Sequence, residues 1–122
     1  MDRVFFGLGA VLGGIGVAVG AFGAHGLRSR IGPEMLAVFE TGVRYHLVHA
    51  LALLAVGWAA SRWPSPAVAA AGWFFVAGVF LFSGSLYALA LTGVRALGLV
   101  TPVGGGALIA GWIALVWAAW RA

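Results

Sequence analysis

The sequence contains no cysteine and no lysine, and its only charged side chains are seven arginines and three carboxylates. Without cysteine, the chain cannot form disulfides or thiolate metal sites. The arginines are scattered singly, which indicates anchoring at a membrane surface and not a nucleic-acid-binding patch. No nucleophile elbow, phosphate-binding glycine loop or catalytic dyad is visible. The sequence therefore predicts a protein that is not an enzyme, with no catalytic residues, no metal site, no cofactor and no nucleic-acid partner.

Apolar residues dominate what is present. The chain is 63% hydrophobic with a mean hydropathy of +1.07, and ten charged groups could not cover a soluble domain of 122 residues. Runs free of Arg, Asp and Glu cover residues 4–24, 45–61, 63–94 and 96–120. The first run is longer than the core of a signal peptide, so it predicts an uncleaved transmembrane helix. Crossing a bilayer takes about 20 helical residues. The whole chain, 1–122, is therefore predicted to be a single integral membrane domain.

We expect four helices, at residues 4–24, 33–60, 67–91 and 102–120. Pro33 and Pro102 favour helix starts, because the first helical position needs no N–H donor. The second helix is too long for a perpendicular span, so its first turns, through about Glu40, are predicted to lie at or outside the interface. The expected fold is all-α, a four-helix transmembrane bundle with short loops and an interfacial N-terminal extension of the second helix. Arginine counts on the two sides are nearly equal and assign no orientation.

Small residues repeat along two of these helices at spacings of three and four, which places them on one face. Such stripes let a neighbouring backbone approach closely. We therefore predict helix packing at both stripes and expect Gly13→Leu to destabilise the fold or an oligomer. The predicted packing residues are Gly9, Gly13, Gly16 and Gly20 in the first helix, and Gly106, Ala110 and Ala114 in the fourth.

Residues 39–54 carry most of the polar groups found inside a predicted helix. Glu40 and Arg44 are spaced i,i+4 with the acid first, which predicts an interfacial ion pair. Tyr45 and His49 lie on the other side of the helix, facing the bundle. An unpaired polar group is costly in lipid, so His49 is expected to form a buried hydrogen bond across the bundle. Its candidate partners are Ser83, Ser85 and Tyr87 in the third helix, or the backbone around His25.

Two other interpretations of the histidines remain open. His46 and His49 are spaced i,i+3 and could share a metal ion, but zinc requires three or four ligands and no further ligand lies near them. A proton relay through His49 is the second alternative, because histidine titrates near physiological pH. The predicted intramembrane polar cluster comprises His25, Thr41, Tyr45, His49, Ser83, Ser85 and Tyr87.

Four motifs, taken together, resemble the DUF423 family of small bacterial membrane proteins, which has a eukaryotic relative of the transmembrane-protein-256 type. They are GAFGAHGL at 20–27, TGVRYHLVHALALL at 41–54, FSGSLY at 82–87, and TPVGG at 101–105 followed by Gly111-Trp112. The resemblance implies a four-helix inner-membrane protein without an established activity. Glu40, Arg44 and His46 stand outside the family's pattern. The positions it implies are His25, Thr41, Gly42, Tyr45, His49, Ser83, Gly84, Ser85, Tyr87, Thr101, Pro102 and Gly104.

The first functional hypothesis is a non-enzymatic scaffold or accessory subunit, multi-pass in the inner (plasma) membrane, whose polar cluster keeps the helices in register. The alternative is a small transporter or channel, in which the same cluster lines a pathway within the bundle or an oligomer. The expected partners are membrane lipids, and a second copy of the chain or an unidentified membrane protein.

Overall fold

Helices account for nearly all of the fold. In the computed structural model, which describes residues 1–121, the chain forms four helical spans and these residues contain no strand. Each span is long and apolar enough to cross a membrane, which confirms the predicted all-α four-helix architecture. The elements are α1 (Asp2–Phe22), the π-helical turn η1 (Gly23–Leu27), α2 (Pro33–Arg62), α3 (Pro66–Gly78), the π-helical turn η2 (Val79–Ser83), α4 (Gly84–Thr92), the 3₁₀ helix η3 (Arg95–Leu99) and α5 (Thr101–Arg121).

Local sequence explains where the helices begin. α2 starts at Pro33, as predicted, and Pro66 takes the first position of α3. The Ser65 hydroxyl caps α3 by accepting a hydrogen bond from the Val68 N–H at 3.3 Å. The third span, predicted as one helix at 67–91, instead contains the π turn η2, in which the Gly84 N–H donates to the Val79 carbonyl five residues earlier. Hydropathy is unchanged through this turn, so it left no signal in the sequence.

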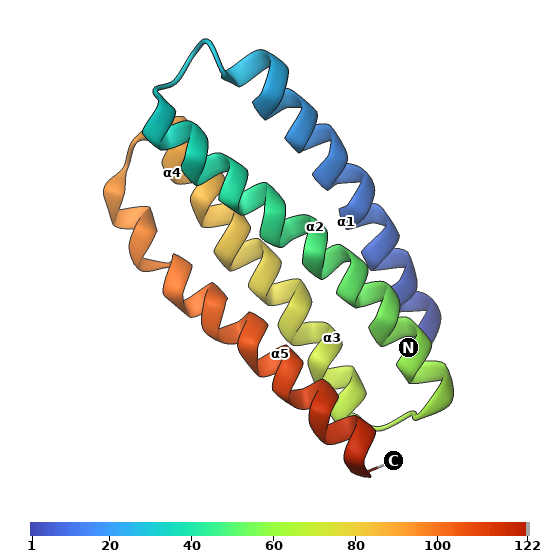
Figure 1. The fold of residues 1–122 in the computed structure, drawn as a ribbon. Helices are drawn as coiled ribbons and strands as arrows, with labels where there is room; N and C mark the ends of the chain where they lie inside the picture. The colour runs from blue at the N-terminus through green and yellow to red at the C-terminus, as the bar shows by residue number, and fades with distance from the viewer. Residues whose placement is uncertain (122) are drawn as a thin grey trace.

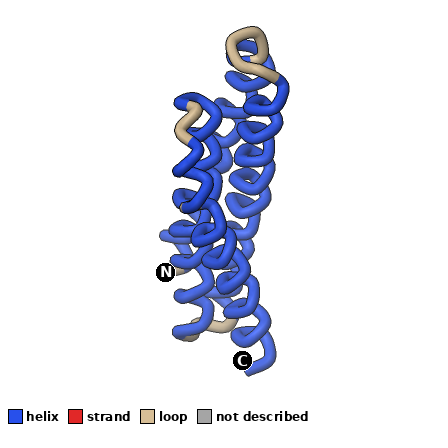
Figure 2. The backbone as a smooth tube through the Cα atoms, turned by 90° about the vertical axis from the view of Figure 1, so that its left-hand side faces the viewer, coloured by secondary structure: helices blue, strands red, loops and turns tan. Residues whose placement is uncertain are grey.

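The four spans run side by side as two helical hairpins, α1 with α2 and α3–η2–α4 with α5 (Figure 1). α2 is the central helix, because it packs against α1 on one side and α3, η2 and α4 on the other. The loops lie toward the two ends of the bundle (Figure 2). We call the end with both termini and residues 63–65 the lower end. The upper end carries residues 28–32 and 93–100.

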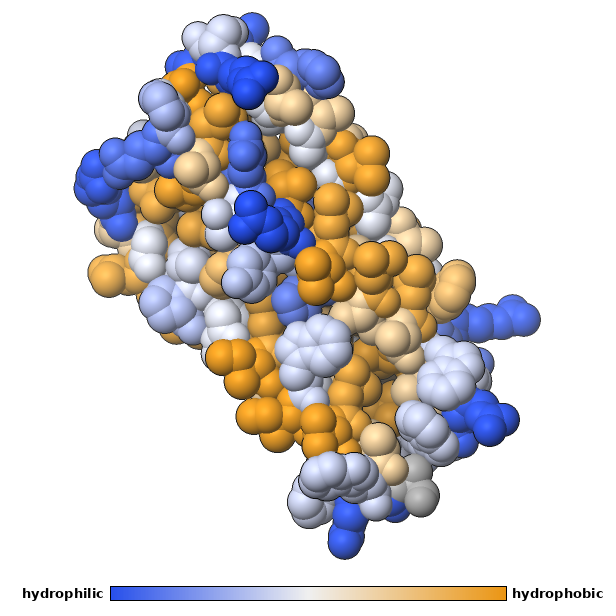
Figure 3. Space-filling model, viewed as in Figure 1, coloured by the Kyte–Doolittle hydropathy of each residue, from blue (hydrophilic) through white to orange (hydrophobic). Residues whose placement is uncertain are grey.

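The surface matches a bilayer environment. Hydrophobic side chains cover most of the middle of the visible face, and most of the hydrophilic ones gather at the two ends (Figure 3). Many large apolar side chains are more than half exposed, including Leu51 at 67% and Ile113 at 64%. With 30 residues, α2 is about 45 Å long, whereas the hydrocarbon core is about 30 Å thick. About ten residues of α2 must therefore lie outside the hydrocarbon or be accommodated by tilt.

The predicted glycine stripe of α1 lies against α2. A Cβ at Gly9 would lie 2.7 Å from the Ala50 carbonyl oxygen, and one at Gly16 would lie 2.6 Å from Leu47 Cδ2. Gly20 faces Val43 at 3.2 Å, which is also tight, but Gly13 has only Ala50 Cβ at 3.9 Å. The close approach of the two backbones therefore depends on Gly9 and Gly16. Gly13, the position chosen above for substitution by leucine, is the least crowded glycine of the stripe.

The predicted packing stripe of α5 is wrong at its first residue, Gly106, which faces away from the bundle. Gly106 is exposed and a Cβ there would meet nothing within 4 Å, while Ala110 and Ala114 are only partly buried. A Cβ at Gly104 would instead press on the backbone of Phe82 and Leu81 in η2, and one at Gly111 would lie 2.6 Å from the Phe75 ring. The buried face of α5 carries Gly104, Leu108, Gly111 and Ala118.

Gly9→Ala should lower the stability of the protein, whereas Gly13→Ala should leave it unchanged or raise it. Overpacking costs about 1–3 kcal/mol, and the group that a Gly9 methyl would meet is a carbonyl that cannot rotate away. At Gly13 the methyl fits, and alanine favours helix by about 1 kcal/mol over glycine. Thermal midpoints of the two variants in the same detergent measure the difference. Equal midpoints would contradict the packing described for α1 and α2.

Candidate functional site

His46 links α2 to two other helices at once. It is 4% exposed, and its Nε2 lies 2.8 Å from the Leu12 carbonyl oxygen in α1. Its Nδ1 lies 2.8 Å from the Tyr87 hydroxyl in α4. A carbonyl only accepts, so the neutral ring carries its proton on Nε2 and accepts the Tyr87 O–H at Nδ1. Both nitrogens are therefore occupied by protein partners.

Two glycines make room for this arrangement. A Cβ at Gly16, one turn above Leu12 in α1, would lie 3.2 Å from His46 Cδ2. A Cβ at Gly42, one turn before His46, would lie 2.8 Å from Cε1 of the Tyr87 ring. Without these two close approaches, neither the imidazole nor the phenol could reach its partner. Gly16 and Gly42 therefore make the hydrogen bonds of His46 possible, because neither has a side chain that would occupy the space of the two rings.

His49 faces the opposite hairpin. Its Nδ1 lies 2.7 Å from the Tyr45 carbonyl oxygen of its own helix, and its Nε2 accepts the indole N–H of Trp112 in α5 at 3.0 Å. The Phe75 ring lies against both, with centroids 5.4 Å from His49 and 5.0 Å from Trp112. Because Nδ1 donates and Nε2 accepts, the geometry requires a neutral imidazole. A proton on Nε2 would oppose the Trp112 N–H.

Hydroxyl groups complete the connections toward the upper end. The Ser83 hydroxyl, 1% exposed, donates to the Gly42 carbonyl at 2.7 Å and so joins η2 to α2. Ser85 donates to the Phe82 carbonyl at 2.9 Å, and its oxygen lies 2.6 Å from the Thr101 hydroxyl. A single hydroxyl proton is then already used, so Thr101 is the donor in this pair. Ser85 and Thr101 join α4 to the start of α5.

The predicted cluster is only partly assembled. His49 bonds to Trp112, and among the described residues it has no hydrogen bond to Ser83, Ser85, Tyr87 or the backbone around His25. His25 is exposed in η1, and Tyr45, predicted to face inward, is 41% exposed. The Thr41 hydroxyl donates at 2.9 Å to the Ala37 carbonyl of its own helix, so it does not cross the bundle.

The predicted ion pair does not form in this conformation. Glu40 and Arg44 are both exposed, and the ion pairs found among residues 1–121 do not include them. Glu34 instead lies 4.0 Å from Arg95, and both side chains are at least 75% exposed. Such an exposed pair contributes little to stability. Glu34, Glu40, Arg44 and Arg95 are thus exposed on the surface of the protein.

The ring nitrogens of His46 and His49 bond to different parts of the bundle and not to one common site. His46 is bonded between α1 and α4, whereas His49 is bonded to α5, so the ring nitrogens are engaged with different helices. Within the described part of the chain, no group of three His, Cys, Asp or Glu side chains is placed to hold a metal ion. The buried side-chain nitrogen and oxygen atoms of these residues all have hydrogen-bond partners. The buried polar side chains therefore connect α2 to α1, η2, α4 and α5.

The sequence interpretation missed His46 and Trp112 as bonding residues. His46 is spaced i,i+3 from His49, so a helical wheel places both on the broad buried side of α2. Trp112 was counted as part of a motif and not as a donor. The available signal was an indole N–H in the middle of a predicted span, because such a donor has no water to bond in the hydrocarbon and usually finds an acceptor in the protein.

Comparison with known proteins places the chain among small membrane proteins. The family described as "Protein of unknown function (DUF423)" matches residues 19–105. The chain is similar to the UPF0382 membrane protein YwdK of Bacillus subtilis (strain 168), with 48% identity over 96% of each chain. It is also similar to the UPF0382 membrane protein SH2409 of Staphylococcus haemolyticus (strain JCSC1435), with 45% identity over 93% of each chain. No solved structure matches the chain.

Proposed function

Because the chain belongs to the DUF423 family of membrane proteins, whose activity is unknown, we propose that it is a non-enzymatic scaffold or accessory subunit of the bacterial plasma (inner) membrane. Its polar side chains serve to hold four apolar helices in one register. The exposed apolar surface of the spans then meets lipid, a second copy of the chain or another membrane protein.

The observation that carries this proposal is the complete pairing of the buried polar groups. Among residues 1–121, every buried side-chain nitrogen or oxygen has a partner in the chain. His46, His49, Ser83 and Ser85, the polar and charged residues found buried, each bond to a different helical segment or its own backbone. A pathway for ions or polar solutes needs polar groups that face water in turn. Groups that are saturated inside the protein favour a structural role.

The apolar groove beside His46 supports the same interpretation. A cavity of about 230 Å³ opens on the surface between α1 and the η2–α4 segment. Apart from the edges of His46 and Tyr87, apolar side chains and a glycine line it, so it would accept a lipid chain more readily than water. The lining residues are Leu12, Ile15, Val19, His46, Val79, Phe80, Gly84 and Tyr87.

Cysteine labelling distinguishes the scaffold from a transport pathway, because the natural chain has no cysteine. Ser83→Cys is close to isosteric and places a thiol at a position 1% exposed, inside the polar network. In intact proteoliposomes we expect no reaction with a charged, membrane-impermeant maleimide added to either side. Ser29→Cys and Ser61→Cys, exposed at the upper and lower ends, are the matched controls and should react.

Labelling of Ser83→Cys at a rate close to that of either control would overturn the proposal, since water would then reach the network. A second measurement tests for a pathway that is too narrow to admit the maleimide. Proton flux into vesicles, followed with a pH-sensitive dye, should equal that of protein-free vesicles. A protein-dependent flux that is abolished in His49→Ala would establish the transporter alternative.

A further inference from the structure

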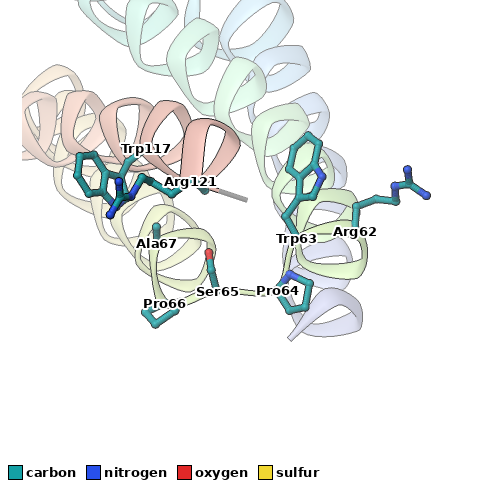
Figure 4. Close-up of a pocket in the computed structure, with 9 residues that line it drawn as sticks. Arg62, Trp63, Pro64, Ser65, Pro66, Ala67, Trp117 and Arg121 are labelled. Atoms are coloured by element: carbon teal, nitrogen blue, oxygen red, sulfur yellow. The ribbon is translucent and has the colours of Figure 1, made fainter.

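The lower end of the bundle carries a cavity that lies apart from the histidine network. Its volume is about 460 Å³, and it lies between the α2–α3 connection and the last turns of α5 (Figure 4). Residues far apart in the sequence meet there. The principal lining residues are Arg62, Trp63, Ser65, Ala67, Trp117 and Arg121.

The charge around this cavity is unbalanced. Among residues 1–121, the ion pairs join Met1 to Asp2 at 3.9 Å and Arg95 to Glu34 at 4.0 Å, and neither includes Arg62 or Arg121. Asp2, the described carboxylate at this end, is already engaged by the N-terminal ammonium and by the Arg3 backbone N–H at 2.9 Å. Two guanidinium groups therefore line a cavity without a carboxylate partner among these residues. The complementary ligand is an anion.

The donors around the cavity suit a phosphate. The Arg121 guanidinium lies over the Trp117 ring, 5.1 Å from its centroid, and this cation–π contact holds it beside the cavity. The Ser65 oxygen accepts the Val68 N–H, so its proton remains free to donate, and in Figure 4 the hydroxyl points into the space between Arg121 and Trp63. Arg62 projects outward past Trp63 in the same view, so it contributes charge at the mouth. The Arg121 guanidinium and the Ser65 hydroxyl thus line one cavity from different elements, and both are donors that phosphate oxygens accept.

The position of the cavity identifies the source of the phosphate. Trp63 and Trp117 form its walls, and Trp58 packs edge-on against Trp63 with ring centroids 5.2 Å apart. Trp120 is 82% exposed at the same end. Tryptophan gathers at the level of the lipid headgroups, where an indole has both an apolar and a polar environment. A phosphate bound at this depth is most readily supplied by a phospholipid.

We propose that this cavity binds the phosphate of an anionic phospholipid headgroup, with the Arg121 guanidinium and the Ser65 hydroxyl as donors and Arg62 as a neighbouring positive charge. The site is separate from the histidine network and does not depend on the scaffold hypothesis.

Delipidated protein in a neutral detergent provides the test. Phosphatidylglycerol, phosphatidylcholine and inorganic phosphate are titrated separately, with bound lipid counted by native mass spectrometry and the thermal midpoint as a second readout. We expect phosphatidylglycerol to bind more tightly than phosphatidylcholine. Arg121→Gln should weaken its binding about fivefold, since one basic side chain near a lipid surface contributes about that factor. Arg62→Gln should have a smaller effect.

The matched control is Arg28→Gln, an exposed arginine at the upper end, which should leave lipid binding unchanged. Equal losses in Arg28→Gln and Arg121→Gln would overturn the proposal, because they would indicate attraction by net charge alone. Stabilisation by millimolar inorganic phosphate without any preference among lipids would overturn the assignment to a lipid and identify a free anion as the ligand. Arg121→Lys keeps the charge and should retain part of the binding.

Discussion

Gly104→Val should lower the stability of the bundle by about 3 kcal/mol or more. A Cβ at this position would press on the backbone nitrogen of Phe82 and lie 2.7 Å from the Leu81 carbonyl carbon. Backbone atoms in η2 cannot rotate away as a side-chain end can, so α5 would have to separate from the third span. Overpacking usually costs about 1–3 kcal/mol, and a contact with rigid backbone places this case at or above the upper limit. The same separation would break the bond between Thr101 and Ser85.

The control for this experiment is Gly106→Val, two residues further along the same helix. A Cβ there would meet nothing within 4 Å and would face lipid. Helix propensity, hydrophobicity and volume change equally in the two variants. Thermal midpoints in detergent, supported by the yield of monodisperse protein, compare them directly. Similar midpoints for the two variants would show that the buried face assigned to α5 is wrong.

His46→Ala should be the most damaging substitution among the polar residues, at about 2–4 kcal/mol. It removes both hydrogen bonds of the imidazole, leaves the Tyr87 hydroxyl without its acceptor and opens a cavity between α1 and α4. His25→Ala, which truncates an exposed histidine in η1, should change stability by less than about 0.5 kcal/mol. Equilibrium unfolding in mixed micelles gives both values.

A double-mutant cycle isolates the contact between His46 and Tyr87. The cycle combines His46→Ala with Tyr87→Phe, and we expect a coupling of about 0.5–2 kcal/mol for a hydrogen bond inside a membrane protein. Additive effects would show that the phenol is held by its aromatic neighbour Phe39, whose ring centroid lies 5.0 Å away, and not by the histidine.

The four spans were predictable because lipid imposes a strong and simple constraint. A helix must satisfy its own backbone over about 20 residues, and the hydropathy of this chain meets that requirement four times. Pro33 fixed the start of α2 through the chemistry of the first helical turn. The glycine stripe of α1 was also visible, because spacings of three and four on one helix define a face before any partner is known.

The face of α5 that packs against the bundle was not predictable from the spacing of its small residues. Gly104, Leu108 and Gly111 form one stripe, and Gly106, Ala110 and Ala114 form another of similar composition on a different face. The first is buried against the backbone of η2 and the Phe75 ring, whereas the second is exposed at Gly106 and only partly buried at Ala110 and Ala114. A stripe of small residues indicates that another helix can approach closely. Which of two such stripes is packed depends on where the neighbouring backbone lies.

The partners of the histidines were hidden for a related reason. His46 and His49 share the buried side of α2, yet one enters the groove toward α1 and the other the groove toward α5. A carbonyl acceptor such as that of Leu12 exists at every residue and carries no mark in the sequence. What selects it is the missing side chain of Gly16, whose effect is visible only when the two helices are placed together.

The π turn at Val79–Ser83 has a consequence for how this chain tolerates insertions and deletions. A π turn holds about one residue more than the α-helical turn it replaces. Deleting one residue between Gly78 and Gly84 should therefore restore a regular helix and leave α4 in nearly its present orientation relative to α3, because five residues of a π turn cover about the same rotation and rise as four residues of an α-helix. Ser85 and Tyr87 would then still face Thr101 and His46, whereas a deletion within the regular helix α3 would turn both by about 100°. The π turn is therefore a place where the third span can lose one residue and keep its hydrogen bonds to the neighbouring helices.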